Sequence, residues 1–90
     1  MSPNEPSDAM TIQLVPVRHA IAAEVRAEMA RQNKSMRDLS PVLGIAHSGL
    51  ALRVKGDVAF RGEELVVLAG ALGVPVEQFL TVPLPIPSAA

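Results

Sequence analysis

The sequence predicts an all-α protein, a compact bundle of five helices in a single domain. A chain of 90 residues with 49% hydrophobic content is long enough for one core and too short for two. The only aromatic residues are Phe60 and Phe79, so the core must consist mainly of interlocking aliphatic side chains, which suits packed helices. Apolar residues recur at intervals of three and four along much of the chain, as amphipathic helices require.

The first helix is predicted over residues 18–32. Ile21, Val25 and Met29 follow one another at four-residue spacing, with charged residues between them. Asn33 then suits the left-handed conformation that closes many helices, because Asn tolerates positive φ better than most residues with a side chain.

The second helix begins near a pair of residues, Ser35 and Asp38, whose spacing resembles a capping box. Leucines and valine at positions 39, 42 and 43 supply its apolar face. Pro41 lacks an N–H donor and crowds the carbonyl four residues before it, at a cost of about 3 kcal/mol inside a helix. Two alternatives follow: the helix is kinked, or it starts late with Ser40 as its cap and Pro41 in its first turn.

The third helix is predicted over residues 46–55, after a tight turn at Gly44. Helical periodicity places Leu50 and Val54 inward, and Gly56 ends the helix. This register turns outward the side chains of Ser48, Leu52 and Lys55. His47 lies near the start of the helix, and Arg53 lies at the edge between its inward and outward sides.

Two further helices follow in the last third of the chain. Leu65, Leu68 and Leu72 mark the fourth helix, which Gly73 closes, and residues 74–80 predict a short fifth helix. Residues 81–90 alternate proline with apolar residues and predict an extended tail. The domain is therefore expected over residues 18–80, with tails at 1–17 and 81–90.

The N-terminal tail includes the segment TIQLVPV at 11–17, which is rich in β-branched residues and predicts an extended β-arm. Apolar residues of the two tails exceed what a five-helix domain of this size can bury, so we expect them at a homodimer interface. The residues assigned to this interface are Ile12, Leu14, Phe79, Val82, Leu84 and Ile86.

Composition excludes several classes of protein. The chain has no cysteine, which removes disulfides and thiolate metal sites and favours the cytoplasm, the host cytoplasm if a phage encodes the protein. His19 has no companion ligands, so no metal or cofactor is expected. No catalytic arrangement, secretion signal or membrane-spanning run occurs in the sequence, so we expect neither an enzyme with a small-molecule substrate nor a membrane protein.

Charge is unevenly distributed although the net charge is only −1. Residues 34–61 hold five basic and two acidic side chains, a net charge of +3, whereas residues 62–90 hold three glutamates and no basic residue. The basic cluster in residues 34–61 is either a solvated face, where most charged residues lie, or a surface that contacts phosphates, which the scarcity of acids in this segment favours.

The order of these elements resembles the helix-turn-helix domain of the Cro and phage-repressor family, also called XRE-type, over residues 18–80. The landmarks that carry the resemblance are Ser35, Leu39, Gly44, Ile45, Leu50, Gly56, Leu65, Leu68, Ala69 and the ALGV sequence at 71–74. The stretch LRVKGDVAF is also similar to segments of small regulators from actinobacteria and their phages. The family implies a homodimer that binds double-stranded DNA and regulates transcription, with the second helix of the motif in the major groove.

The family's functional positions map onto particular residues of this chain. Its base-reading positions correspond to His47, Ser48 and Leu52, and its phosphate-contacting positions to Met36, Arg37 and Lys55. Charge and expected exposure add Arg53 and Arg61 to the phosphate-contacting set.

The third helix departs from the family pattern in being poor in polar side chains. Ala46 replaces the usual Ser or Thr at its start, and Gly49, Ala51 and Leu52 offer few hydrogen bonds to bases. An alternative is therefore a helix-turn-helix fold that binds a protein partner, such as another regulator, through the apolar surface around Leu52.

Overall fold

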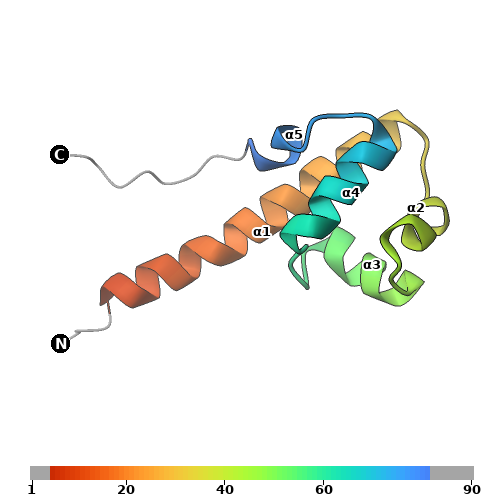
Figure 1. Ribbon diagram of the computed structural model, residues 1–90. Helices are drawn as coiled ribbons and strands as arrows, with labels where there is room; N and C mark the ends of the chain where they lie inside the picture. Colours follow the sequence, from red (N-terminus) through yellow and green to blue (C-terminus); the bar gives the residue numbers. More distant parts are fainter. Residues whose placement is uncertain (1–4, 82–90) are drawn as a thin grey trace.

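The structure, a computed structural model, describes the backbone of residues 5–81 and the side chains of residues 16–81 (Figure 1). Its five helices are α1 (Glu5–Arg31), α2 (Met36–Leu43), α3 (His47–Lys55), α4 (Gly62–Leu72) and α5 (Glu77–Leu80). No strand occurs within residues 5–81. The predicted all-α, five-helix fold is therefore confirmed.

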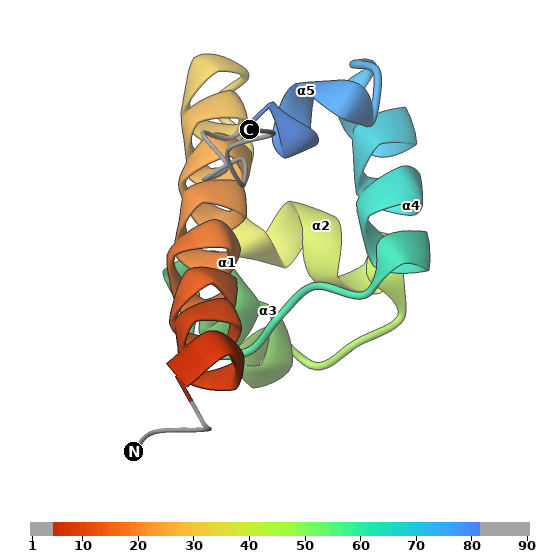
Figure 2. The ribbon, with the colours of Figure 1, turned by 90° about the vertical axis from the view of Figure 1, so that its left-hand side faces the viewer.

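The helices surround one apolar core. α1 packs against α3 and α5, while α2 packs against α3 and α4. Figure 2 shows α1 and α4 on opposite sides of the bundle, with α2 and α5 between them. The buried core residues are Val25, Met29, Leu39, Leu50, Val54, Leu65, Leu68, Ala69, Leu72 and Phe79. All five helices thus contribute to the same core.

α1 is longer than the sequence predicts, and the β-arm prediction for residues 11–17 is wrong. The helix begins at Glu5 and contains Pro16, so it runs without a break across the expected start of the domain at residue 18. In Figure 1 its N-terminal half extends beyond the rest of the bundle. Each β-branched residue makes helix formation less favourable by only a few tenths of a kcal/mol. A helix that is already nucleated in the following residues can extend through such positions.

The residues that end α1, α2 and α4 adopt the left-handed conformation expected of Asn and Gly at these positions. Asn33 adopts a left-handed φ of 56°, and Gly44 and Gly73 each adopt a φ of 69°. Ser35 caps α2, and the helix continues through Pro41 to Leu43. The late-start alternative with Ser40 as cap is therefore wrong. The Ser40 side chain is buried, inside α2 instead of before it.

Phe79 lies in the core and not at a subunit surface, which corrects its assignment to a dimer interface. Its side chain is fully buried, and it is the largest side chain enclosed in this way. α5 packs on α1 and so places this ring in the interior. An aromatic ring buries a large apolar area, so Phe79 contributes most of the apolar burial of this four-residue helix.

A polar cluster of Glu28, Gln32 and Gln78 joins three helices beside this core. The Gln32 amide donates to Glu28 Oε2 at 2.7 Å and to the Leu72 carbonyl at 2.6 Å, and the Gln78 amide donates to Glu28 Oε1 at 2.6 Å. Arg31 forms an ion pair with the same carboxylate. Hydrogen bonds from Gln32, then Gln78, and the charge of Arg31 hold the pKa of Glu28 below its ordinary value of 4.5 although burial opposes them.

Candidate nucleic-acid interface

α2 starts at a complete capping box. The Asp38 N–H donates to Ser35 Oγ at 3.2 Å, and the Ser35 N–H donates to Asp38 Oδ2 at 2.8 Å. The Ser35 backbone N–H, followed by its hydroxyl, lowers the pKa of Asp38 from its ordinary value of 3.8. This reciprocal cap fixes the first turn of α2 and with it the direction in which Arg37 leaves the helix.

Three residues connect α2 to α3, as a tight helix-turn-helix requires. The left-handed Gly44 donates its N–H to carbonyls of Pro41 and Ser40, and the Ile45 N–H donates to the Ser40 carbonyl at 3.2 Å. Ile45 is partly buried against the core and closes the corner between the two helices. Ala46 then caps α3 without a side-chain hydrogen bond, as expected for an alanine.

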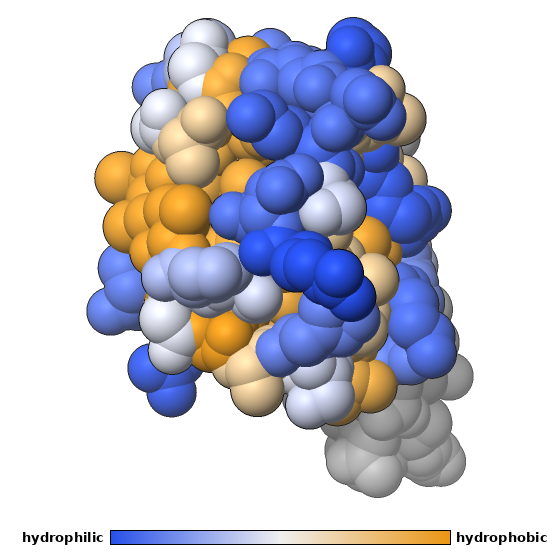
Figure 3. Space-filling model, turned by 90° about the vertical axis from the view of Figure 1, so that its right-hand side faces the viewer, coloured by the Kyte–Doolittle hydropathy of each residue, from blue (hydrophilic) through white to orange (hydrophobic). Residues whose placement is uncertain are grey.

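α3 buries one side and exposes the other. Leu50 and Val54 are buried in the core, while His47, Ser48, Leu52 and Lys55 are exposed, as the helical register predicts. Leu52 is 41% exposed, a large value for a leucine. In Figure 3 the molecule is seen from the side on which Figure 1 places α2 and α3, and hydrophilic residues run down the middle of this face beside an apolar area.

The C-terminal end of α3 is held against α1 by two contacts. Arg26 on α1 donates through Nη1 to the Val54 carbonyl at 2.6 Å. Gly56, with a φ of 89°, ends α3 and lies in close contact with His19. A Cβ added at position 56 would lie only 2.3 Å from His19 Nδ1, so the contact leaves no room for a side chain. His19 is therefore a packing residue of the α1–α3 contact.

The residues expected to contact phosphates differ in how far their side chains are exposed to solvent. Arg37, Lys55 and Arg61 are exposed, and Lys55 approaches Asp57 at 3.9 Å across solvent. Met36, also expected at a phosphate, is half-buried and packs against the core.

Arg53 serves the fold, which the sequence did not reveal. Its side chain is 17% exposed, and its Nε donates to Glu64 Oε1 on α4 at 2.9 Å while Nη1 donates to the Gly49 carbonyl at 2.9 Å. A Cβ added at Gly49 would lie 3.3 Å from the same Nη1. The absence of a side chain at position 49 therefore gives the Arg53 guanidinium room to lie over the preceding turn of α3. The pairing joins residues eleven apart, and no local pattern signals it.

Glu64 accepts a second hydrogen bond in this arrangement. The Arg61 backbone N–H donates to Glu64 Oε1 at 2.8 Å at the start of α4. Burial raises the pKa of Glu64, but the Arg61 N–H and the Arg53 guanidinium together outweigh it, so the pKa lies below its ordinary value of 4.5. Glu64 thus links the end of α3 to the beginning of α4.

Several predicted interface residues lie partly or wholly outside the described residues. The backbone of Ile12 and Leu14 belongs to α1, but their side chains lie outside the described residues. Val82, Leu84 and Ile86 lie wholly outside them.

The described residues contain no group of three or more His, Cys, Asp or Glu side chains placed to hold a metal ion. None of the helices described combines the length and the apolar character needed to cross a bilayer. Comparisons with protein-family models, with curated proteins and with solved structures find no match to this chain.

Proposed function

We propose that the protein is a small transcriptional regulator that binds double-stranded DNA through α2 and α3, as a homodimer of the phage-repressor or Cro type. The observation that supports this most is the outer side of α3. Its inner residues Leu50 and Val54 are anchored in the core, so the exposed residues are held on a rigid support. The major groove of B-form DNA is about 12 Å wide and admits one α-helix.

In this proposal the base contacts come from the first two turns of α3. His47 and Ser48 donate and accept hydrogen bonds at base edges, and Leu52 packs on a thymine methyl group. Few direct contacts are available, so phosphate contacts supply most of the affinity. The exposed cations that we assign to these contacts are Arg37 in the first turn of α2, Lys55 at the end of α3 and Arg61 just before α4.

Selection from a random duplex library, followed by fluorescence anisotropy at several salt concentrations, tests the proposal. We expect an enriched sequence that is bound at least about a thousandfold more tightly than bulk DNA. His47→Ala and Ser48→Ala should each reduce this preference by about 1–3 kcal/mol per lost contact. Glu63→Gln, an exposed substitution on α4, is the control. Equal binding of all sequences, or none, would contradict sequence-specific recognition.

The exposure of Leu52 favours a second candidate function, the binding of a protein such as another regulator. Small residues at positions 49 and 51 lie near it on the helix, so the surface around Leu52 is apolar. Here Leu52→Asp abolishes a complex with the partner, whereas Leu80→Asp, on an α5 leucine that is 47% exposed, leaves it intact. No duplex would then be preferred over bulk DNA.

A further inference from the structure

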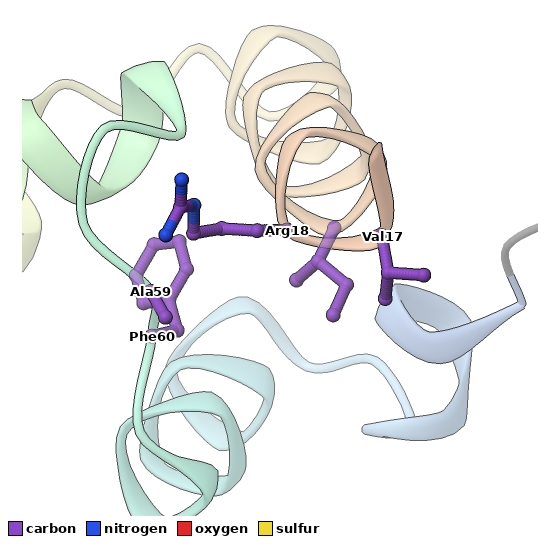
Figure 4. Close-up of a pocket in the computed structure, with 5 residues that line it drawn as sticks. Val17, Arg18, Ala59 and Phe60 are labelled. Carbon is purple, nitrogen blue, oxygen red and sulfur yellow. The ribbon is translucent and has the colours of Figure 1, made fainter. Parts of the chain in front are cut away.

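A small apolar pocket lies between α1 and the segment that joins α3 to α4. It has a volume of about 190 Å³ and is lined by Val17, Arg18, Ile21, Ala59 and Phe60. Figure 4 shows the Arg18 side chain extending from α1 towards Ala59 and Phe60. The pocket is separate from the exposed side of α3 that carries the proposed DNA contacts, since none of those residues lines it.

Among the described residues that line this pocket, Arg18 alone is charged, and its Nε is shielded from solvent without a hydrogen-bond partner. Two other arginines have acceptors: the exposed Arg26 donates to the Val54 carbonyl, and the half-buried Arg53 donates to Glu64. A buried donor without an acceptor destabilises the fold, and more so when it is charged. No carboxylate of the described residues forms an ion pair with Arg18.

We propose that this pocket binds a short aliphatic carboxylate. Aliphatic and aromatic side chains line the space for the hydrocarbon part, while the guanidinium supplies the positive charge and the N–H donors that a carboxylate accepts. A volume of about 190 Å³ is below the range for drug-sized ligands and holds roughly six groups the size of a water molecule. The size therefore favours chains of about four to six carbons.

Binding requires a small rearrangement of Arg18. Because Nε is enclosed, the guanidinium must turn so that Nε and one terminal nitrogen face the carboxylate together, in the paired geometry that arginine favours. The bound ligand then bridges α1 and the segment around Phe60. This inference does not depend on DNA binding.

An NMR titration of the full chain with acetate, butanoate and hexanoate tests the proposal. We expect affinity to rise by about tenfold or more from acetate to hexanoate as methylene groups enter the pocket. The Nε–H resonance of Arg18, assigned from its loss in Arg18→Lys, should shift on binding. Hexylamine and hexan-1-ol probe the head group, because the guanidinium repels the first and gives the second no charge-assisted bond. Equal affinity for either of these, or no shift with any acid, would overturn the proposal.

Two substitutions test the pocket itself. Arg18→Gln should weaken hexanoate binding by about tenfold or more, whereas Lys34→Gln, an exposed cation elsewhere, should leave it unchanged. Ala59→Leu fills the pocket from an exposed position and should block binding without loss of the fold. The helical circular dichroism of each variant is measured alongside. Hexanoate binding to folded Ala59→Leu at unchanged affinity would place the ligand elsewhere and refute the site.

Discussion

Arg53 and Glu64 form an ion pair of 2.9 Å between α3 and α4, with side chains 17% and 10% exposed. The same carboxylate oxygen accepts the N–H of Arg61, so one side chain both caps α4 and holds the end of α3. The orientation of the exposed side of α3 therefore depends on an acid from the next helix. This makes Glu64 a positioning residue for the proposed DNA contacts.

Glu64→Ala should lower the free energy of unfolding by about 1–3 kcal/mol, because Arg53 and the start of α4 each lose an acceptor. Urea denaturation followed by circular dichroism measures the change. The matched control is Glu63→Ala, one residue earlier in the same first turn but exposed, which should change the stability by less than about 0.5 kcal/mol. Similar losses in both variants would show that the ion pair contributes nothing specific.

Acid should destabilise the protein through three carboxylates. The pKa values of Glu28, Asp38 and Glu64 are lowered in the folded state. At a pH just below the ordinary pKa values of these groups, the native protein therefore binds fewer protons than the unfolded chain. Their stabilisation is complete above about pH 5 and is lost as the pH falls through the lowered values. Urea midpoints measured from pH 6 to pH 3 should therefore fall, and Glu28→Gln should make the fall shallower. A constant midpoint over this range would contradict the assignment.

Gly56→Ala should be among the most destabilising small substitutions. The added Cβ would lie 2.3 Å from His19 Nδ1, and the φ of 89° is unfavourable for alanine by about 1–2 kcal/mol even without the clash. Thermal unfolding of Gly56→Ala should be compared with Gly70→Ala, at a helical position where nothing lies within 4 Å of the new Cβ. The latter should raise stability by about 0.5–1 kcal/mol.

The double variant Gly56→Ala and His19→Ala separates the two causes. Removing the imidazole should restore the part of the stability lost to the clash and leave the part due to backbone strain. If the double variant is no more stable than the sum of the two single changes predicts, His19 does not pack on Gly56.

Local signals in the sequence predicted the ends of α1, α2 and α3 well. Asn33, the pair Ser35 and Asp38, and Gly44 each act within four residues of the chain, so their conformations follow from short-range chemistry that the sequence displays directly. The inward direction of Leu50 on α3 follows in the same way from helical periodicity.

Longer-range features escaped prediction for physical reasons. Residues 11–17 look suitable for a strand, but β-propensity describes packing on a sheet, and no strand within residues 5–81 offers them one. Phe79 was assigned to an interface because hydrophobicity alone does not distinguish a core from a subunit contact. Arg53 was assigned to phosphate because its acceptor, Glu64, lies on a different helix.

Substitution of the two basic residues near the end of α3, Arg53 and Lys55, should have different effects on DNA binding and on stability. Lys55 has a side chain that is 67% exposed, with only a 3.9 Å approach to Asp57, so it remains available to a phosphate. Lys55→Ala should weaken DNA binding similarly for all sequences and reduce the slope of log K against log salt by about 1. Anisotropy titrations on the selected duplex and on an unrelated duplex measure both effects.

Arg53→Ala should act first on stability, since its guanidinium is occupied by Glu64 and the Gly49 carbonyl. We expect a lower unfolding free energy by about 1–3 kcal/mol and, at a temperature where the variant is folded, a salt slope equal to that of the parent protein. A reduced slope in Arg53→Ala with unchanged stability would mean that the guanidinium leaves Glu64 for a phosphate. In that case Arg53 belongs with Lys55 among the DNA contacts, as its charge alone suggests.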